Sequence, residues 1–353
     1  MPSLKFGLIG CGRIAEANHI PEIRSLGKKA VIAAVYDPNR EKAQALAEKN
    51  ELSPVFCKNP EELLASEVDA VIIATPNSLH YPQTLAALKA GKHVLVEKPM
   101  ASSIAEADEM IDLALKKKLV LQVNQSLRYH APYARIAELI RKGVIGKPLH
   151  ARCLRTAFDS PDVLWSPGAA WFVQKKFKGS LVTDIAVHMA DALSWFFGPV
   201  TSVSAQVRCL RHEVPDNVTA LFRHENGADS VLELSWTFPF SKSAFEIYGE
   251  EGSIVLGPDR IEIEKKGAKK AKVIPFQSIR AMPNSHASFL KAVAGHDLNA
   301  WAYGRNAIAL CMAILESDKK RGCIRPQYRK SGGETAPGGK KQQQGEKKNG
   351  GIL

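Results

Sequence analysis

A glycine-rich turn directly after the first apolar run constrains the fold more than any other feature of this sequence. Residues 4–10 form a mainly apolar run, and residues 10–15 read G-C-G-R-I-A, a G-x-G-x-x-A pattern. In this pattern Gly10 permits a tight turn, Gly12 lets the backbone approach a pyrophosphate, and the small Ala15 lets a helix pack closely on a strand. The turn therefore predicts a strand, a sharp turn and a helix in succession, which is the first unit of a dinucleotide-binding fold.

An acidic residue follows the second apolar run at the spacing that a dinucleotide site requires. Residues 30–36 form that run, and Asp37 comes after it, about 20 residues beyond the turn. A carboxylate there accepts hydrogen bonds from the adenosine ribose and disfavours a 2′-phosphate, so NAD is the predicted cofactor, whereas nearby Arg40 leaves NADP open. Arg13 and Ile14, at the helix N-terminus, would contribute to the pyrophosphate site. Alternatively, Asp37 could simply cap the next helix.

Apolar runs alternate with amphipathic helical segments up to about residue 124. The runs are 4–10, 30–36, 69–74, 93–97 and 120–124, and the helical segments between them include 40–49, 79–90 and 104–116. This alternation predicts an α/β fold with an N-terminal Rossmann domain, a doubly wound parallel sheet, over residues 1–123. A short strand near residues 54–57 would complete the sheet.

The rhythm changes after residue 124. Helices are expected at 132–142, 181–197, 285–294 and 302–319, and strands at 149–156, 200–208, 218–224, 230–237, 244–248 and 261–264. Successive strands separated by turns predict an α+β domain with a large, mainly antiparallel open sheet over residues 124–329. Residues 330–353 are rich in Lys, Gly and Gln and nearly lack apolar residues, so we predict a disordered tail.

Composition argues against several classes of protein. The net charge of +12 is spread over separate runs such as 116–118 and 175–176, without a groove-reading motif, so we expect no nucleic-acid partner. The six cysteines form no C-x-x-C pair and have no zinc-type spacing, which predicts reduced thiols and no metal site. No apolar run approaches the roughly 18 residues that span a membrane, and no export signal is visible. We therefore expect a cytoplasmic protein that does not enter membranes.

Motifs beyond the glycine turn indicate a known family. The chain resembles the glucose–fructose oxidoreductase, inositol dehydrogenase and rhizopine-catabolism (Gfo/Idh/MocA) family at 75–80 (T-P-N-S-L-H), 97–99 (E-K-P), 128–129, 143–146 and 179–188 (G-S-L-V-T-D-I-A-V-H). The resemblance implies an NAD(P)-dependent oxidoreductase that acts on a hydroxyl carbon of a sugar, sugar derivative or cyclitol. It also implies a homodimer or homotetramer that assembles through the second domain.

The same resemblance assigns the catalytic residues to Lys98, Asp184 and His188. Asp184 and His188 are four residues apart in an expected helix, so both side chains would reach one substrate hydroxyl. His188 titrates near neutrality and could accept the hydroxyl proton, while Lys98 would stabilise the developing alkoxide and Asp184 would orient His188 or the substrate. Taken alone, each residue is better explained by an ordinary surface pair or a hydrogen bond on the helix surface, and the catalytic interpretation depends on their combination.

Further residues are expected around the cofactor and the substrate. The candidates for the nicotinamide side stand at or near strand ends: Thr75, Pro76, Asn77, His80, Glu97, Lys98 and Asn124. The candidates for the substrate are Arg128, Tyr129, Trp165 and Trp171, which could instead pack between the domains. The chain has Lys178 where the family often has glycine. The lysines at 175–176 could face an acidic or phosphorylated substrate, although solvated loop residues are the simpler interpretation.

Two other functions remain compatible with these motifs. A relative of this kind could retain NAD and use transient oxidation to cleave a glycosidic substituent, acting as a glycosidase or lyase. Alternatively, the protein could be a non-catalytic regulator that binds the cofactor and uses the basic tail as an interaction arm. The presence of Lys98, Asp184 and His188 favours an enzyme.

Overall fold

The first sheet has the strand order of a doubly wound nucleotide-binding fold. The computed structural model of the chain describes residues 3–329. Six parallel strands lie in the order β3-β2-β1-β4-β5-β6: β1 (Leu4–Ile9), β2 (Ala30–Tyr36), β3 (Val55–Phe56), β4 (Ala70–Ile73), β5 (His93–Glu97) and β6 (Leu121–Asn124). The direction of winding reverses between β1 and β4, so the carboxyl ends of these two strands border the crevice where such sheets bind ligands.

Helices cover both faces of this sheet, which is why its strands are mainly apolar. The helices are α1 (Ile20–Ser25), α2 (Arg40–Lys49), α3 (Pro60–Ala65), α4 (Asn77–Lys89) and α5 (Ile104–Lys117). All four residues of β4 are buried, and they divide between two separate apolar clusters, one on each face of the sheet. A strand buried on both faces lacks the polar alternation of a half-exposed strand.

The second sheet is mainly antiparallel. Its strand order is β14-β13-β12-β11-β7-β10-β9-β8, and its one parallel pair is β7 with β10. The strands are β7 (Pro148–Thr156), β8 (Val200–Arg208), β9 (Asn217–His224), β10 (Asp229–Ser235), β11 (Lys242–Gly249), β12 (Gly252–Leu256), β13 (Arg260–Lys265) and β14 (Lys272–Pro275). The predicted fold class is confirmed in both parts, and the structure adds β12 and β14, short strands that the sequence pattern did not single out.

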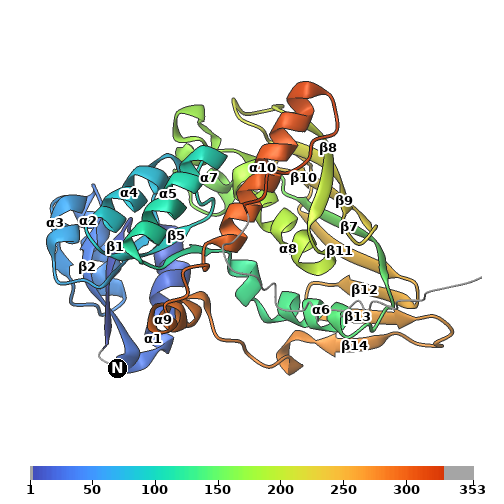
Figure 1. Cartoon of the computed structure of the whole chain (residues 1–353), viewed down its shortest axis with the longest axis horizontal. Coiled ribbons are helices and arrows are strands. Elements are labelled where there is room, and N and C mark those ends of the chain that lie inside the picture. Colours follow the sequence, from blue (N-terminus) through green and yellow to red (C-terminus); the bar gives the residue numbers. More distant parts are fainter. Residues whose placement is uncertain (1–2, 330–353) are drawn as a thin grey trace, which may run out of the picture.

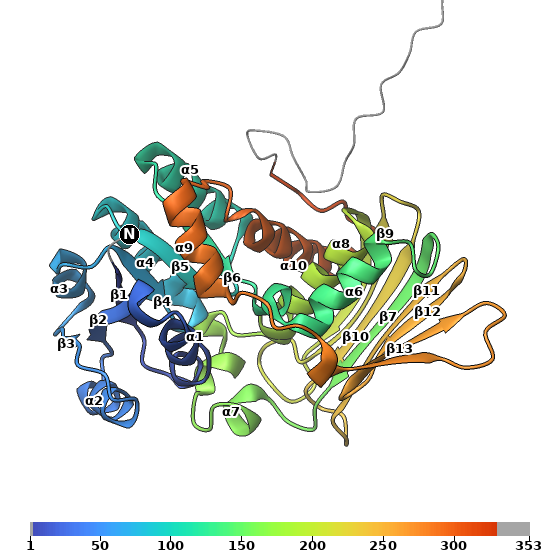
Figure 2. The ribbon, with the colours of Figure 1, turned by 90° about the horizontal axis from the view of Figure 1, so that it is seen from below.

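Helices pack on one face of the second sheet. They are α6 (Ala131–Arg141), α8 (Val187–Phe197) and the long C-terminal helix α10 (Ala302–Lys320), and Figure 2 shows α6 and α8 alongside the sheet. Burial alternates along β9, as expected for a sheet with one packed and one open face. A short helix, α7 (Pro161–Leu164), lies in the connection between β7 and α8.

The last two helices return to the first sheet and tie the two parts together (Figure 1). On α9 (Ser285–Gly295), the ring of Phe289 packs against Phe6 of β1, with ring centroids 5.7 Å apart. On α10, a Cβ at Gly304 would lie 2.2 Å from the side chain of Val123, so only glycine allows the helix to approach β6 this closely. The domain boundary near residue 124 stays a prediction, and the predicted tail lies outside the described residues.

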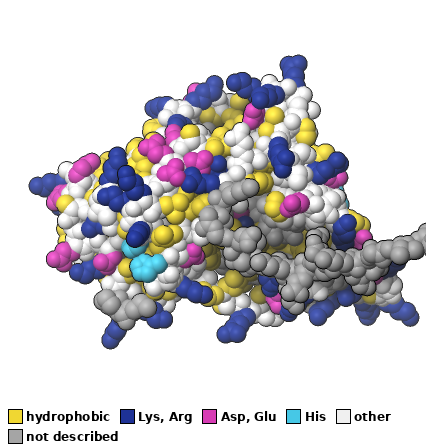
Figure 3. All heavy atoms as spheres, in the orientation of Figure 1, with side chains coloured by type: hydrophobic (Ala, Val, Ile, Leu, Met, Phe, Trp, Pro, Cys, Tyr) yellow, Lys and Arg dark blue, Asp and Glu magenta, His cyan; other side chains and the backbone are white. Residues whose placement is uncertain are grey.

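The surface carries both signs of charge. Over the face in Figure 3, Lys and Arg side chains are scattered among acidic ones and do not form a single stripe. Within residues 3–329, no helix has the length and apolar character to cross a bilayer, and no group of three or more His, Cys, Asp and Glu could hold a metal ion.

Candidate active site

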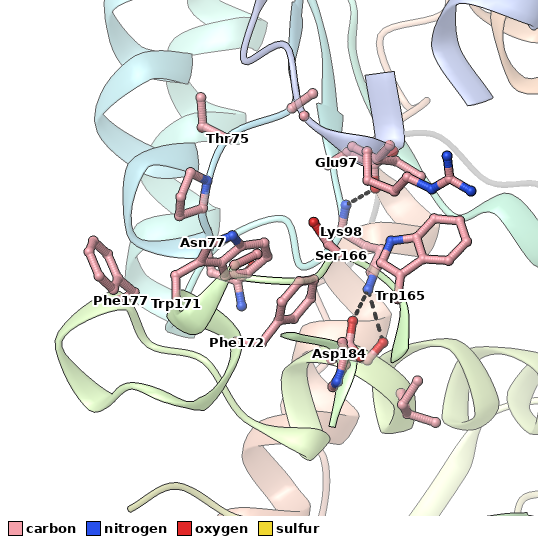
Figure 4. Close-up of a pocket in the computed structure, with 18 of the residues that line it drawn as sticks. Thr75, Asn77, Glu97, Lys98, Trp165, Ser166, Trp171, Phe172, Phe177 and Asp184 are labelled. Carbon is pink, nitrogen blue, oxygen red and sulfur yellow. Dashed lines mark hydrogen bonds and ion pairs between the residues drawn. The ribbon is translucent and has the colours of Figure 1, made fainter. Parts of the chain in front are cut away.

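A cavity of about 1170 Å³ lies between the two sheets. On one side it is lined by the glycine turn and by the segments after β2, β4 and β5, and on the other by the start of α8 and the strand ends of the second sheet. The connection that contains α7 contributes aromatic side chains (Figure 4). The cavity therefore contains the crevice that the strand order of the first sheet predicts.

The two glycines of the turn have different roles. Gly10 adopts φ +96°, its N–H donates to the carbonyl of Tyr36 at 2.8 Å, and a Cβ there would lie 2.5 Å from the carbonyl oxygen of Ala74. Around Gly12 the nearest atom to an added Cβ is Lys42 Nζ, at 3.8 Å. Gly10 is thus needed by the fold, whereas Gly12 leaves open space beside a helix N-terminus where a pyrophosphate would fit.

Asp37 is held at the cavity wall and does not cap the next helix. Its Oδ2 accepts a hydrogen bond from the N–H of Cys11 at 2.9 Å, and its Oδ1 accepts one from the N–H of Asn39 at 3.0 Å. The side chain of Asn39 caps α2 by accepting from the N–H of Lys42. Asp37 and Lys42 line the cavity, whereas Arg40 does not.

The segment after β4 divides into lining and bracing residues. Thr75, Pro76 and Asn77 line the cavity, and Thr75 Oγ1 donates to Gln83 Oε1 at 2.7 Å. His80 is buried behind them. Its Nδ1 lies 2.7 Å from the carbonyl oxygen of Pro99, and its Nε2 lies 2.8 Å from that of Thr75. The structure thus gives His80 contacts that hold two loops together, and a direct cofactor contact stays a prediction.

The three residues predicted to be catalytic lie together in the cavity (Figure 4 labels Lys98 and Asp184). Lys98 Nζ lies 2.5 Å from Asp184 Oδ1 and donates to the carbonyl oxygen of Asp184 at 3.0 Å. Asp184 belongs to a π-helical turn, Val182–Ala186, that leads into α8, where His188 follows. Such turns are frequent at functional sites. Asp184 therefore pairs with Lys98, a partner that the sequence did not indicate.

His188 is free to exchange a proton with a bound molecule. It lines the cavity and forms no hydrogen bond with any residue among 3–329, and its Nδ1 is buried. Burial, followed by the charges of Lys98 and Arg155, lowers the pKa of His188 well below its usual value of 6.5. The imidazole is consequently neutral at pH 7, the form that can accept a proton.

Glu97 holds the end of β5 from which Lys98 projects. Its Oε1 accepts from Asn124 Nδ2 at 2.6 Å, and its Oε2 accepts from the N–H of Lys98 at 3.1 Å. Nε2 of His19 lies 3.1 Å from Glu97 Oε1. Burial alone would raise the pKa of Glu97. The combined effect of His19, Asn124 and Lys98 is larger and lowers this pKa below its usual value, so the carboxylate stays ionised. Asn124 does not line the cavity and contacts Glu97 from behind, so a direct cofactor contact of Asn124 stays a prediction.

This polar group continues into α9, a connection that the sequence did not indicate. Nδ1 of His19 lies 3.0 Å from Nε2 of His286, and Nδ1 of His286 lies 2.8 Å from Glu22 Oε2. Burial lowers the pKa of His286, despite the opposing effect of Glu22. The chain of contacts fixes α9 against α1 and the end of β5. Two histidines far apart in sequence carry no local signal of this pairing.

The four predicted substrate residues separate into two pairs. Arg128 forms a two-pronged pair with Asp191, with both N–O distances 2.8 Å, and its guanidinium lies 3.6 Å from the ring centre of Tyr303. Neither Arg128 nor Tyr129 lines the cavity, so these contacts favour the packing alternative, and a substrate contact stays a prediction. Trp165 and Trp171 do line it.

The two tryptophans form part of an aromatic wall. Arg13 lies over the ring of Trp165 at 5.3 Å, and Trp171 stacks on Phe172. Arg13 and Ile14 also line the cavity. In the same connection Lys175 and Lys176 are exposed and do not line the cavity, and Lys178 pairs with Glu106 at 3.0 Å. These contacts agree with the interpretation of the lysines as solvated loop residues.

Strand ends of the second sheet supply residues that sequence reasoning missed. Thr156 of β7 is paired with Ser235 of β10 and with Lys242 of β11, so three strand ends meet at the cavity. The residues contributed there are Arg155, Thr156, Ala157, Ser235, Trp236, Ser241 and Ser243. Polar residues at the ends of apolar strands are a visible signal, but the strand order that joins these ends is not.

Two family models match most of the chain. Residues 4–125 match the oxidoreductase family with an NAD-binding Rossmann fold, GFO_IDH_MocA, and residues 133–255 match the GFO/IDH/MocA C-terminal domain. The chain belongs to this oxidoreductase family. The family resemblance drawn from the motifs is therefore confirmed, as are the predictions of an NAD cofactor and of a dehydrogenase or reductase.

Named members of the family act on sugars and cyclitols. The chain is 29% identical over 302 residues to 1,5-anhydro-D-fructose reductase of Ensifer adhaerens, covering 83% of this chain and 89% of the relative. It is 28% identical over 330 residues to inositol 2-dehydrogenase 3 of Saccharopolyspora erythraea, covering 89% and 93%. The crystal structure of the WlbA dehydrogenase from Bordetella pertussis with NADH and UDP-GlcNAcA is 26% identical, with a TM-score of 0.79 and coverage of 93% and 99%.

Proposed function

We propose that the protein transfers a hydride between a hydroxyl carbon of a sugar, sugar derivative or cyclitol and NAD. The observation that carries the proposal is the convergence of Lys98, Asp184 and His188 in one cavity with the glycine turn. The named relatives, a sugar reductase and an inositol dehydrogenase, support the class of substrate.

The residues on the cofactor side fit a dinucleotide. Space beside Gly12 and the helix N-terminus would accommodate the pyrophosphate, and the fixed carboxylate of Asp37 would accept from the ribose hydroxyls, which favours NAD over NADP. Thr75, Pro76 and Asn77 would border the nicotinamide, near Lys98. When bound, the nicotinamide ring supplies the hydride acceptor or donor.

The chain's own residues supply the proton chemistry. In the oxidation direction, neutral His188 takes the proton of the substrate hydroxyl as hydride leaves the same carbon, and in reduction it returns that proton. The ammonium group of Lys98 stabilises negative charge on the substrate oxygen. Asp184 holds the ammonium group through the 2.5 Å contact and so positions it. The aromatic wall around Trp165 and Trp171 supplies apolar surface against which a ring can pack.

The direct test measures cofactor binding and turnover separately. The full-length protein is titrated with NADH by fluorescence, and NADH absorbance is then followed in both directions over a panel of pyranoses, their keto derivatives and cyclitols. We expect NADH binding and turnover of at least one panel member. His188→Asn should lower kcat by roughly 10²–10⁴-fold, the usual contribution of a general acid or base, with NADH binding retained. Absence of NADH binding, or full activity in His188→Asn, contradicts the proposal.

A further inference from the structure

Arg155 is a cation without a protein partner in the cavity. It stands near the end of β7, on the same strand face as the buried Ala151 and Cys153, and it lines the cavity. Among residues 3–329 it forms no hydrogen bond or ion pair. Its neighbour on the opposite strand face, Arg152, lies outside the cavity and has a partner, with Nε 2.7 Å from Glu233 Oε2.

The other charged groups on the substrate side of the cavity already have contacts. Lys98 and Asp184 pair with each other, and Asp159 Oδ1 accepts from the N–H of Ser160 at 2.8 Å. Arg13 and Asp37 stand on the cofactor side, by the glycine turn. Arg155, an exposed side chain that lines the cavity, is thus the cation on this side that no carboxylate of the described residues pairs with, so it is free to pair with a bound molecule.

A serine hydroxyl of the neighbouring strand lies beside this position and can donate to an oxyanion. Ser243 of β11 is the register partner of Arg155 and lines the cavity, as does Ser241. A guanidinium presents parallel N–H groups that match the two oxygens of a carboxylate. A phosphate would bring nearly two negative charges to a place that offers one free cation, so the charge balance favours a carboxylate.

We propose that Arg155 binds a carboxylate of the substrate, so that the enzyme acts on a sugar acid. The inference rests on the proposed function and narrows its substrate class. In this arrangement the carboxylate anchors one end of the molecule at β7, while the reacting hydroxyl carbon lies by Lys98 and His188. Because the charge of Arg155 helps to lower the pKa of His188, a carboxylate bound there also makes His188 a stronger base in the complex.

The test compares ligands that differ only at the acidic group. Calorimetry on the full-length protein with NADH present measures binding of methyl glycosides of glucuronate, galacturonate and mannuronate, of the matching neutral hexoses, and of the hexose 6-phosphates. We expect at least one uronate to bind about tenfold or more tightly than its neutral partner, the scale of a charge-assisted hydrogen bond. Arg155→Gln should remove that preference, and Arg155→Lys should restore part of it. Arg152→Gln is the matched control and should change neither.

The outcomes separate this inference from the proposed function. The carboxylate site is overturned if the neutral hexoses bind as tightly as the uronates or more tightly. It is also overturned if Arg155→Gln weakens the binding of uronates and of neutral hexoses by the same factor. Preference for the 6-phosphates overturns it in favour of a phosphorylated substrate. Binding of a uronate that depends on Arg155, without turnover of any ligand, supports the carboxylate site and counts against hydride transfer. Turnover of neutral sugars without preference for acids supports hydride transfer and contradicts the proposal that the substrate is a sugar acid.

Discussion

The two sides of the cavity are built differently. The cofactor side consists of short consecutive segments after the parallel strands, and their polar groups are fixed by backbone contacts, such as those of Asp37 with the N–H groups of Cys11 and Asn39. The substrate side consists of side chains from α8, from a long connection and from three strands of the second sheet. Its free charge, Arg155, forms no hydrogen bond or ion pair with the described residues.

This difference indicates which parts of the molecule determine specificity for the cofactor and which determine specificity for the substrate. The cofactor side depends on backbone shape, so a change there affects folding or NAD binding whatever the substrate is. The substrate side depends on which side chains project from a fixed sheet, so one substitution can change the substrate without disturbing the cofactor. Lys98 belongs to the cofactor side and Asp184 to the substrate side, so their ion pair forms a bridge between the two sides.

Breaking that bridge should lower activity strongly, by an amount within the range expected for His188→Asn. We expect Lys98→Met to lower kcat/KM by roughly 10²–10³-fold, because charge on the substrate oxygen loses its stabilising ammonium group. Lys98→Arg keeps the ion pair with Asp184 but moves the charge, so activity should fall while the melting temperature stays near that of the wild type. Lys5→Met, which removes an exposed pair with Glu67, is the control. Steady-state kinetics and circular dichroism measure both effects. Wild-type kinetics in Lys98→Met would remove Lys98 from the mechanism.

The two glycines test the claim that the cofactor side depends on backbone shape. Gly12→Ala should weaken NADH binding by about tenfold or more with an unchanged melting temperature, because the added methyl group enters cofactor space and meets no protein atom closer than 3.8 Å. Gly10→Ala should instead destabilise the fold by about 1–3 kcal/mol or more, because of its positive φ and the contact with Ala74. Thermal melts and fluorescence titration separate the two. Equal loss of stability in both variants would contradict the distinction.

A smaller effect is expected at Asp37. Asp37→Ser should reduce the preference for NADH over NADPH by about tenfold, because the carboxylate that accepts from the ribose and repels a 2′-phosphate is lost. The measurement is the ratio of the two dissociation constants. Glu41→Gln, an exposed change on α2, should leave the ratio unchanged. If Asp37→Ser also leaves it unchanged, the carboxylate does not select the cofactor.

The smallest effect concerns pH. The pKa of His188 is lowered and oxidation needs the neutral imidazole, so kcat/KM for oxidation should stay constant as the pH falls through 6.5 and decline only at lower pH. Arg155→Gln removes one of the charges that lower this pKa, so the decline should move to higher pH. Burial is the larger cause of the low pKa of His188 and is unchanged in this variant, so the shift of the pH profile should be small. Arg152→Gln should not move it. A decline at or above pH 6.5 in the wild type would contradict a neutral, desolvated His188.

Sequence reasoning was most informative where a short local pattern indicates a role, and the roles of the residues identified in this way stay predictions. The glycine turn, Asp37, the E-K-P motif and the segment from Asp184 to His188 were all identified, and the structure brings them to one cavity. It was less informative for Arg128 and Tyr129, which lie outside the cavity lining, and for His80 and Asn124, which brace it from behind. Strand-end position indicated closeness to the site but not the direction of each side chain.

The sequence alone determined the first sheet and its glycine turn, because alternating apolar runs and a glycine in the left-handed region leave few other local conformations. Only the tertiary structure decided that Asp184 pairs with Lys98, that His19 meets His286, and that Arg155 faces the cavity without a partner. Lys98 and Asp184 are 86 positions apart in the sequence, and His19 and His286 are 267 positions apart. No local rule specifies which strand ends become neighbours. The NAD half of the site is thus visible in the sequence, while the substrate half depends on how the second sheet is paired.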